Sequence, residues 1–129
     1  MAKTLKDLVA AARAQIEETS IEQFRQTQNS GVEFLLIDVR EAAEYAEGHI
    51  AGATSIPRGI LELCADREYP KRHEELSNAR QRPVIVYCAS GGRGALAAAV
   101  LQQMGFERVQ SLTGGVGRWK ELGLDLAVP

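Results

Sequence analysis

Residues 84–100 read VIVYCASGGRGALAAAV, and this stretch decides the fold. Its first four residues, Val84 to Tyr87, are apolar or aromatic and predict a buried strand. Cys88 stands at the end of that strand. Three glycines follow, and the alanine- and leucine-rich run from Ala95 predicts a helix. The chain therefore runs from a strand, through a thiol and a glycine-rich turn, into the N-terminus of a helix.

The turn after Cys88 has the features of a loop that holds an anion over a nucleophilic sulfur. Free backbone N–H groups and the positive end of the helix dipole lie at a helix N-terminus. Glycine disfavours a helix start, so Gly91, Gly92 and Gly94 indicate amides that turn inward, with positive φ at some positions. Arg93 adds a fixed positive charge beside the thiol. A buried structural cysteine is the alternative, but nucleophile, backbone and charge agree on a reactive thiolate.

Three motifs, in the same order along the chain, resemble those of single-domain rhodaneses, which are sulfurtransferases. The loop CASGGR at 88–93 is similar to the active-site loop of that family. Four stretches of this chain resemble the N-terminal signature of the family: IDVR at 37–40, EY at 44–45, GHIAGA at 48–53 and IP at 56–57. The stretch LTGG at 112–115, together with Trp119, resembles the family's C-terminal signature. The resemblance covers about residues 16 to 124.

This resemblance implies both a fold and a reaction. The fold is a single α/β rhodanese-like domain, with a central, mainly parallel sheet of about five strands and helices on both faces. The reaction is the transfer of a sulfane sulfur from thiosulfate or a persulfide donor to a thiol or cyanide acceptor, through a persulfide on Cys88. Cys88 and Arg93 are the expected catalytic residues, and neither a cofactor nor a metal is required. Ala89 departs from the basic residue that thiosulfate-preferring members often carry there.

The rest of the chain also alternates between helix and strand patterns. Ser20 followed by Gln23 is a capping box and predicts a helix over 20–28. Further strands are expected at 34–39, 54–56 and 109–112, and further helices at 41–46, 59–64, 73–79 and 115–122. Such alternation predicts a parallel sheet, in which ligands bind at the carboxyl ends of the strands. Cys88 falls at that edge.

Several other residues are candidates for the same site. The expected substrate-binding residues are Ala89, Ser90, Gly91, Gly92, Gly94 and Arg58, and the expected structural supports are Asp38, Arg40 and His49. Ser90 can either donate to the anion or cap the helix, and Arg58 can either face the site or lie solvated on the surface. Cys64 is either core filler or a thiol that resolves the persulfide as a disulfide.

Length and composition limit the remaining possibilities. The 129 residues suffice for one domain: residues 16–129 form the predicted rhodanese-like domain, and residues 1–15 form a helical extension. In that helix Leu5, Leu8, Val9, Ala12 and Ile16 share one face, which packs on the core or on a second subunit. The net charge of −2 gives no general attraction to nucleic acid or membranes. We expect a cytoplasmic monomer or homodimer with free thiols.

Two other functions use related residues. The first is a docking module or a carrier that only hands sulfur to a partner, although the presence of both Cys88 and Arg93 favours catalysis. The second is a Cys–Arg phosphatase. Four residues separate Cys88 from Arg93 here, one fewer than in protein tyrosine phosphatases, so the ring of amides is smaller. That size suits the outer sulfur of a persulfide better than a phosphoryl group.

Overall fold

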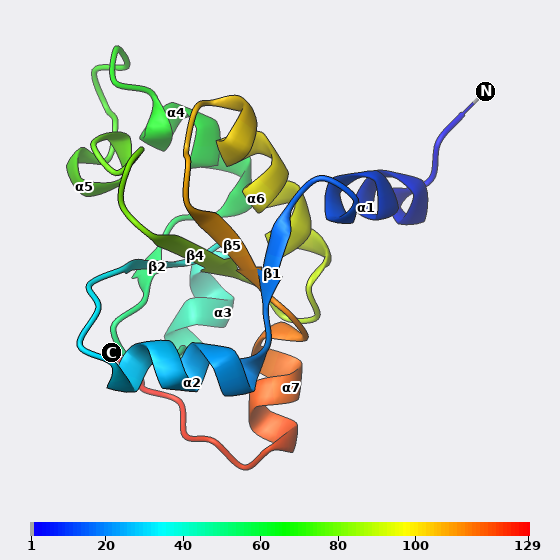
Figure 1. Ribbon diagram of the computed structural model, residues 1–129, viewed down its shortest axis with the longest axis vertical. Helices are drawn as coiled ribbons and strands as arrows, with labels where there is room; N and C mark the ends of the chain where they lie inside the picture. The colour runs from blue at the N-terminus through cyan, green and yellow to red at the C-terminus, as the bar shows by residue number, and fades with distance from the viewer. Residues whose placement is uncertain (1) are drawn as a thin grey trace.

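Five strands form a single sheet in the computed structural model, which describes residues 2–129. They are β1 (Glu17–Thr19), β2 (Leu35–Asp38), β3 (Thr54–Ser55), β4 (Val84–Tyr87) and β5 (Val109–Leu112). All pairings are parallel, and the strand order is β1-β5-β4-β2-β3 (Figure 1). The predicted α/β class and parallel sheet are therefore confirmed. The sequence does not predict β1, because this edge strand is three polar residues long and has no apolar pattern.

Helices cover both faces of the sheet. They are α1 (Leu5–Arg13), α2 (Ile21–Asn29), α3 (Ala42–Glu47), α4 (Leu61–Ala65, after a 3-10 turn at Arg58–Ile60), α5 (Glu74–Ser77), α6 (Gly92–Gln103) and α7 (Gly115–Glu121). One face carries α2, α3 and α7, and the other carries α4, α5 and α6 (Figure 1). The predicted capping box at the start of α2 is confirmed, because Ser20 and Gln23 each accept the other's backbone N–H.

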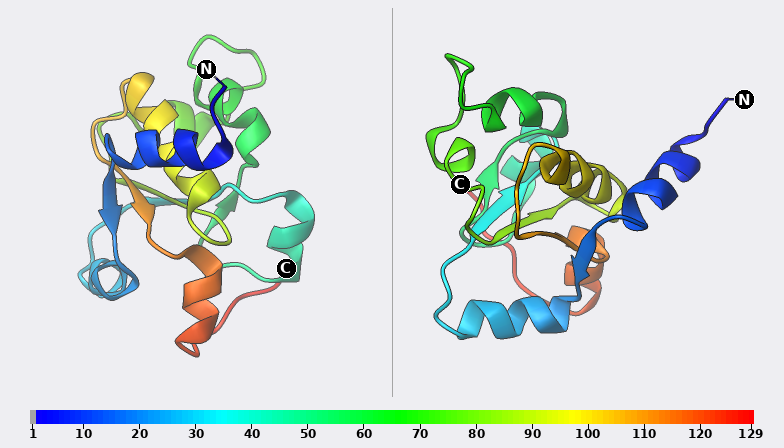
Figure 2. Two further views of the ribbon diagram at one scale, coloured as in Figure 1. Left: turned by 90° about the vertical axis from the view of Figure 1, so that its right-hand side faces the viewer. Right: turned by 45° about the horizontal axis from the view of Figure 1, so that its top comes forward.

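Helix α1 packs against the outside of α6 within its own chain (Figure 2). Val9 and Ala12 of α1 meet Ala95 and Ala99 of α6, whose small side chains allow the two helices to approach closely. The predicted apolar face is only partly covered, since Leu5 is 68% exposed and Leu8 is 48% exposed.

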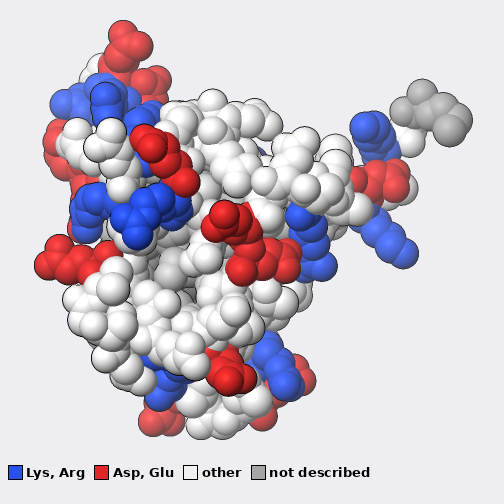
Figure 3. All heavy atoms as spheres, in the orientation of Figure 1, with Lys and Arg blue, Asp and Glu red and all other residues white. Residues whose placement is uncertain are grey.

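Charged side chains of both signs lie close together over the face drawn in Figure 3. This mixture agrees with the small net charge of −2. None of the helices within residues 2–129 combines the length and the apolar character that crossing a bilayer requires.

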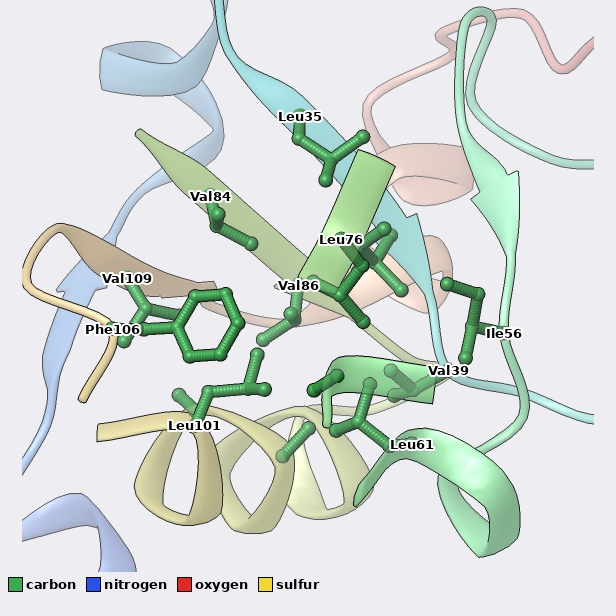
Figure 4. Close-up of a cluster of buried hydrophobic side chains, with 14 of the residues drawn as sticks. Leu35, Val39, Ile56, Leu61, Leu76, Val84, Val86, Leu101, Phe106 and Val109 are labelled. Carbon is green, nitrogen blue, oxygen red and sulfur yellow. The ribbon is translucent and has the colours of Figure 1, made fainter. Parts of the chain in front are cut away.

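Strand β4 supplies side chains to both halves of the core. Val84 and Val86 point into one apolar cluster, while Ile85 and Tyr87 point into the other. The first cluster fills the space between the sheet and α4, α5 and α6, with Leu35, Leu61, Leu76, Leu101, Phe106 and Val109 among its members (Figure 4). Strand β4 is buried on both faces, so packing on both sides holds it in place. Cys88, which directly follows β4, is therefore held in a fixed position.

The first turn of α7 binds the segment after β4 through two backbone hydrogen bonds. The N–H of Val116 donates to the carbonyl of Cys88 at 2.9 Å, and the N–H of Gly117 donates to the carbonyl of Ala89 at 2.8 Å. Gly115 has φ +53°, and a side-chain carbon at this position would collide with the Cys88 carbonyl oxygen. A glycine is therefore required where α7 meets the end of β4.

A buried ion pair fixes the chain after β2. Arg40 donates from Nη2 to Oδ2 of Asp38 at 2.8 Å, and from the same nitrogen to the carbonyl of Gly48. Burial alone would lower the pKa of Arg40, but the hydrogen bonds and the charge of Asp38 outweigh it and raise that pKa. The backbone continues the connection, because Val39 donates to the carbonyl of Tyr87 at 3.0 Å. The ends of β2 and β4 are thus held in register.

We predict that Gly115→Ala destabilises the protein by roughly 2–5 kcal/mol, the sum of left-handed backbone strain and overpacking. Gly123→Ala is the matched control, because Gly123 has φ +73° but open space around its Cα. The control should lose only the strain, about 1–2 kcal/mol. Urea unfolding measures both variants. Equal losses would contradict a steric requirement at Gly115.

We predict that Arg40→Met costs about 3–5 kcal/mol, because it leaves the Asp38 carboxylate buried without its partner. Arg82→Met removes an exposed arginine that pairs with Glu75 at 3.5 Å and should cost less than about 1 kcal/mol. The free energy of unfolding from urea titration compares the two. A loss as small for Arg40→Met as for Arg82→Met would show that the buried pair does not support the fold.

Candidate active site

Cys88 lies directly after β4, with its sulfur against the backbone that leads into α6. The N–H of Gly91 donates to Sγ of Cys88 at 3.0 Å. The residue is only 1% exposed, so the loop of residues 88–93, called here the Cys88 loop, folds closely over the sulfur. This sulfur accepts a backbone hydrogen bond at the N-terminus of a helix, where negative charge is stabilised.

Gly91 in the Cys88 loop and Gly94 in the first turn of α6 are each required by a different structural constraint. Gly91 is the N-cap of α6 and has φ +115°, in the left-handed region that glycine adopts readily. The helix begins at Gly92 rather than at Ala95, so Arg93 and Gly94 lie in its first turn and not in a preceding turn. A side-chain carbon on Gly94 would lie 3.1 Å from Oγ of Ser111, so Gly94 lets α6 start close to the sheet.

The two other residues of the Cys88 loop differ in exposure. Ala89 is half-buried, and its carbonyl is held by α7 as described above. Ser90 is exposed, and no side chain caps α6. Of the two predicted roles of Ser90, helix capping is therefore absent from the structure, and its hydroxyl remains available at the surface of the loop.

Arg93 is held by a glutamate from another part of the chain. Its Nη1 and Nη2 donate to the two carboxylate oxygens of Glu44 in α3, at 2.7 and 3.1 Å. Hydrogen bonds from Arg93 are the main reason that the pKa of Glu44 falls to about 2, although burial opposes them. The pKa of Arg93 is raised, chiefly by hydrogen bonding to Glu44, and less by the negative charges of Glu44, Cys88 and Glu41.

Glu44 belongs to the motif that carries the resemblance, but the sequence does not assign it to the site. It lies 49 residues before Arg93 in the chain. The pair forms because β2 and β4 are neighbours in the sheet, and α3 follows β2 where α6 follows β4. The sequence could have suggested this pair only through the expected parallel sheet, because the segments that follow its strands meet at one edge.

The predicted supporting residues lie at the end of β2, the strand beside β4, and in the segment that follows it. Asp38 and Arg40 form the buried pair already described. The Nδ1 of His49 lies 3.0 Å from the carbonyl of Tyr45, and the imidazole stacks on the Tyr45 ring with 3.7 Å between centroids. His49 also pairs through its backbone with Ala127. The imidazole is therefore engaged within its own segment.

Arg58 lies at the carboxyl end of the sheet, but its side chain is engaged elsewhere. Its backbone N–H donates to the carbonyl of Val39 at 3.0 Å, and its Nη1 donates to Glu62 at 2.8 Å. The side chain lines a groove of about 310 Å³ between α1 and α6, with Leu8 and Leu96. Its buried Nε has no hydrogen-bond partner among residues 2–129.

Cys64 is buried in α4, in the same apolar cluster as Cys88. Burial raises the pKa of the Cys64 thiol, which keeps it protonated. Within residues 2–129 no group of His, Cys, Asp and Glu side chains has the arrangement of a metal site. The chemistry available at this edge of the sheet is therefore that of one cysteine, a set of backbone amides, and an arginine paired with a glutamate.

Comparison with known sequences gives relatives with sulfur-transfer names. The family model for the rhodanese-like domain matches residues 20–122. A sulfurtransferase of Allochromatium vinosum is 33% identical over 114 residues, which cover 88% of this chain and 97% of that protein. The protein YrkF of Bacillus subtilis, named as a candidate sulfur carrier, is 34% identical over 81% of this chain and 51% of its own length.

Solved structures give the same fold. A Rhodopseudomonas palustris protein, described as of unknown function and a possible tyrosine phosphatase, has a TM-score of 0.90 and 29% identity. The match covers 98% of this chain and 96% of that chain, so helix α1 falls within it. A human single-domain sulfurtransferase has a TM-score of 0.72 and 27% identity, over 81% of this chain and 95% of its own.

The family model and the A. vinosum relative both extend over most of the sequence. They confirm the resemblance that the three motifs indicate. The chain belongs to the rhodanese-like family.

Proposed function

We propose that this protein is a sulfurtransferase that carries a sulfane sulfur atom on Cys88 between a donor and an acceptor. The observation that carries the proposal is the 3.0 Å hydrogen bond from the Gly91 N–H to Sγ, at the N-terminus of the twelve-residue helix α6. Relatives named as a sulfurtransferase and as a candidate sulfur carrier support it.

In the first half of the proposed cycle, the Cys88 thiolate attacks the outer sulfur of thiosulfate or of a persulfide. A bond forms between Sγ and that sulfur, and the old sulfur–sulfur bond breaks. Its electron pair leaves with sulfite or with the donor thiolate. The product is a Cys88 persulfide, and no external oxidant is consumed.

In the second half, a thiolate or cyanide attacks the outer sulfur of the Cys88 persulfide. The sulfur–sulfur bond to Cys88 breaks, and its electrons return to Sγ as a thiolate. The acceptor leaves as a persulfide or as thiocyanate. Such an exchange is ping-pong chemistry, because one product leaves before the second substrate binds.

The remaining residues act by holding negative charge at the transferred sulfur. The N–H of Gly91 already donates to Sγ, and the free N–H groups at the N-terminus of α6 are the other backbone donors expected to hold this charge. Ser90 contributes an exposed hydroxyl. Arg93 is paired with Glu44 but lies close enough to Cys88 for their charges to interact, and Asp38, Arg40 and His49 keep the surrounding backbone in place.

We predict that reduced protein incubated with excess thiosulfate or a small persulfide gains the mass of one sulfur atom. Cys88→Ser should gain none, because the nucleophile is absent. Cys64→Ser should gain the same mass as the wild type, because the buried Cys64 thiol stays protonated. Intact mass spectrometry measures all three. No gain with either donor, or a gain that persists in Cys88→Ser, would overturn the proposal.

A carrier that is loaded only by a protein partner is the rival function, and turnover separates it from an enzyme. We predict steady formation of thiocyanate, well beyond one equivalent per protein, when a small donor and cyanide are both present. Colorimetric detection of thiocyanate follows the reaction. A single stoichiometric burst would show a carrier. Hydrolysis of an aryl phosphate without sulfur loading would show a phosphatase.

A further inference from the structure

The positive charge of Arg93 is already neutralised in the folded protein. Both terminal nitrogens of its guanidinium face the two oxygens of Glu44, the two-point geometry in which arginine binds a carboxylate most strongly. Glu44 stays ionised at neutral pH, since its pKa is about 2. Glu41, one helical turn before Glu44, adds a further negative charge near Arg93. An anionic substrate would have to compete with Glu44 for this arginine.

The arginines that follow β2 and β3, and Arg13 of α1, also lie against carboxylates. Arg40 is buried against Asp38, and Arg58 bonds Glu62 at 2.8 Å. Arg13 lies against Gly91, and its Nε is 3.5 Å from Glu18. Within the loop itself, Arg93 is the only charged residue. The site therefore offers the Gly91 N–H and the N-terminus of α6, but little positive charge that no carboxylate faces.

Transfer of sulfur from thiosulfate requires positive charge at the site. Thiosulfate is a dianion, and the thiolate that attacks it adds a third negative charge to the same small volume. The leaving group is sulfite, which departs with two negative charges. With Arg93 already paired, this build-up of charge beside Glu44 and Glu41 is unfavourable.

Transfer of sulfur from the persulfide of a thiol does not require this positive charge. The outer sulfur of the persulfide carries at most one negative charge, and it reacts in its protonated form without any. Attack by the Cys88 thiolate then forms the new sulfur–sulfur bond and expels one thiolate, so a single negative charge is present throughout. Backbone amides at a helix N-terminus are sufficient partners for one charge on sulfur.

We propose that Glu44 is a specificity-determining residue, which pairs with Arg93 and so makes persulfides of thiols, rather than thiosulfate, the donor class of this site. The proposal rests on the sulfur-carrying role of Cys88. It assigns Glu44 no contact with the reacting sulfur, and its effect is exerted through Arg93.

The test measures kcat/KM for thiosulfate and for 2-hydroxyethyl persulfide, whose only ionisable group is its terminal sulfur, with cyanide as the common acceptor. In the wild type the persulfide should exceed thiosulfate at least tenfold. Glu44→Gln keeps the shape of the side chain and its acceptor for the Glu41 N–H, but it removes the negative charge that Arg93 faces and the second of its two acceptor oxygens. This variant should raise kcat/KM for thiosulfate about tenfold or more and change that for the persulfide less than about threefold.

Glu47→Gln is the matched control, because it removes an exposed carboxylate of the same helix that lies outside the pair. It should leave the ratio between the two donors unchanged. Thiosulfate equal to the persulfide in the wild type would overturn the proposal, and so would an unchanged ratio in Glu44→Gln. Should Glu44→Gln fail to fold, the wild-type ratio still decides. Absence of sulfur loading from both donors would instead remove the proposed function, and this inference with it.

Discussion

Two backbone hydrogen bonds hold the Cys88 loop in place, and the site depends on them. They run from the first turn of α7 to the carbonyls of Cys88 and Ala89. With these carbonyls held by α7, the N–H of Gly91 points toward the sulfur and donates to Sγ at 3.0 Å. The close approach is possible because Gly115 has no side chain. The segment that carries the C-terminal motif thus supports the Cys88 loop through these two hydrogen bonds.

The sheet supplies the other constraint. Because β2, β3 and β4 are parallel neighbours, the segments after them meet at one edge, and the buried pair of Arg40 with Asp38 fixes the segment after β2. That edge brings Glu44 and Arg93 together although they are far apart in the chain. Charge at the site is therefore set by the fold as a whole, and the arginine next to the cysteine does not act as a free cation. Backbone dipoles, which no neighbouring carboxylate neutralises, are the more constant source of anion stabilisation here.

Much of this architecture follows from local sequence. The apolar run of β4 and the glycines after Cys88 give the strand, the loop and the helix, and Ser20 with Gln23 gives the start of α2. The errors fall where local signals are weak. Strand β1 exists because β5 pairs with it. Helix α6 begins at Gly92, three residues before Ala95, and its first turn includes Gly94, where a side chain would crowd Ser111. Leu5 and Leu8 follow the helical pattern, yet both remain exposed. The pairing of Arg93 with Glu44 depends on strand order and lies beyond any local pattern.

We propose that the Cys88 loop is already shaped, before loading, to hold a sulfur atom carried on Cys88. A crystal structure of the persulfide-loaded protein is the decisive experiment. We expect one additional sulfur on Sγ of Cys88, within hydrogen-bond distance of the loop amides, with the bonds from Val116 and Gly117 intact. An outer sulfur that points away from those amides, or a loop that has left α7 to accommodate it, would overturn this proposal.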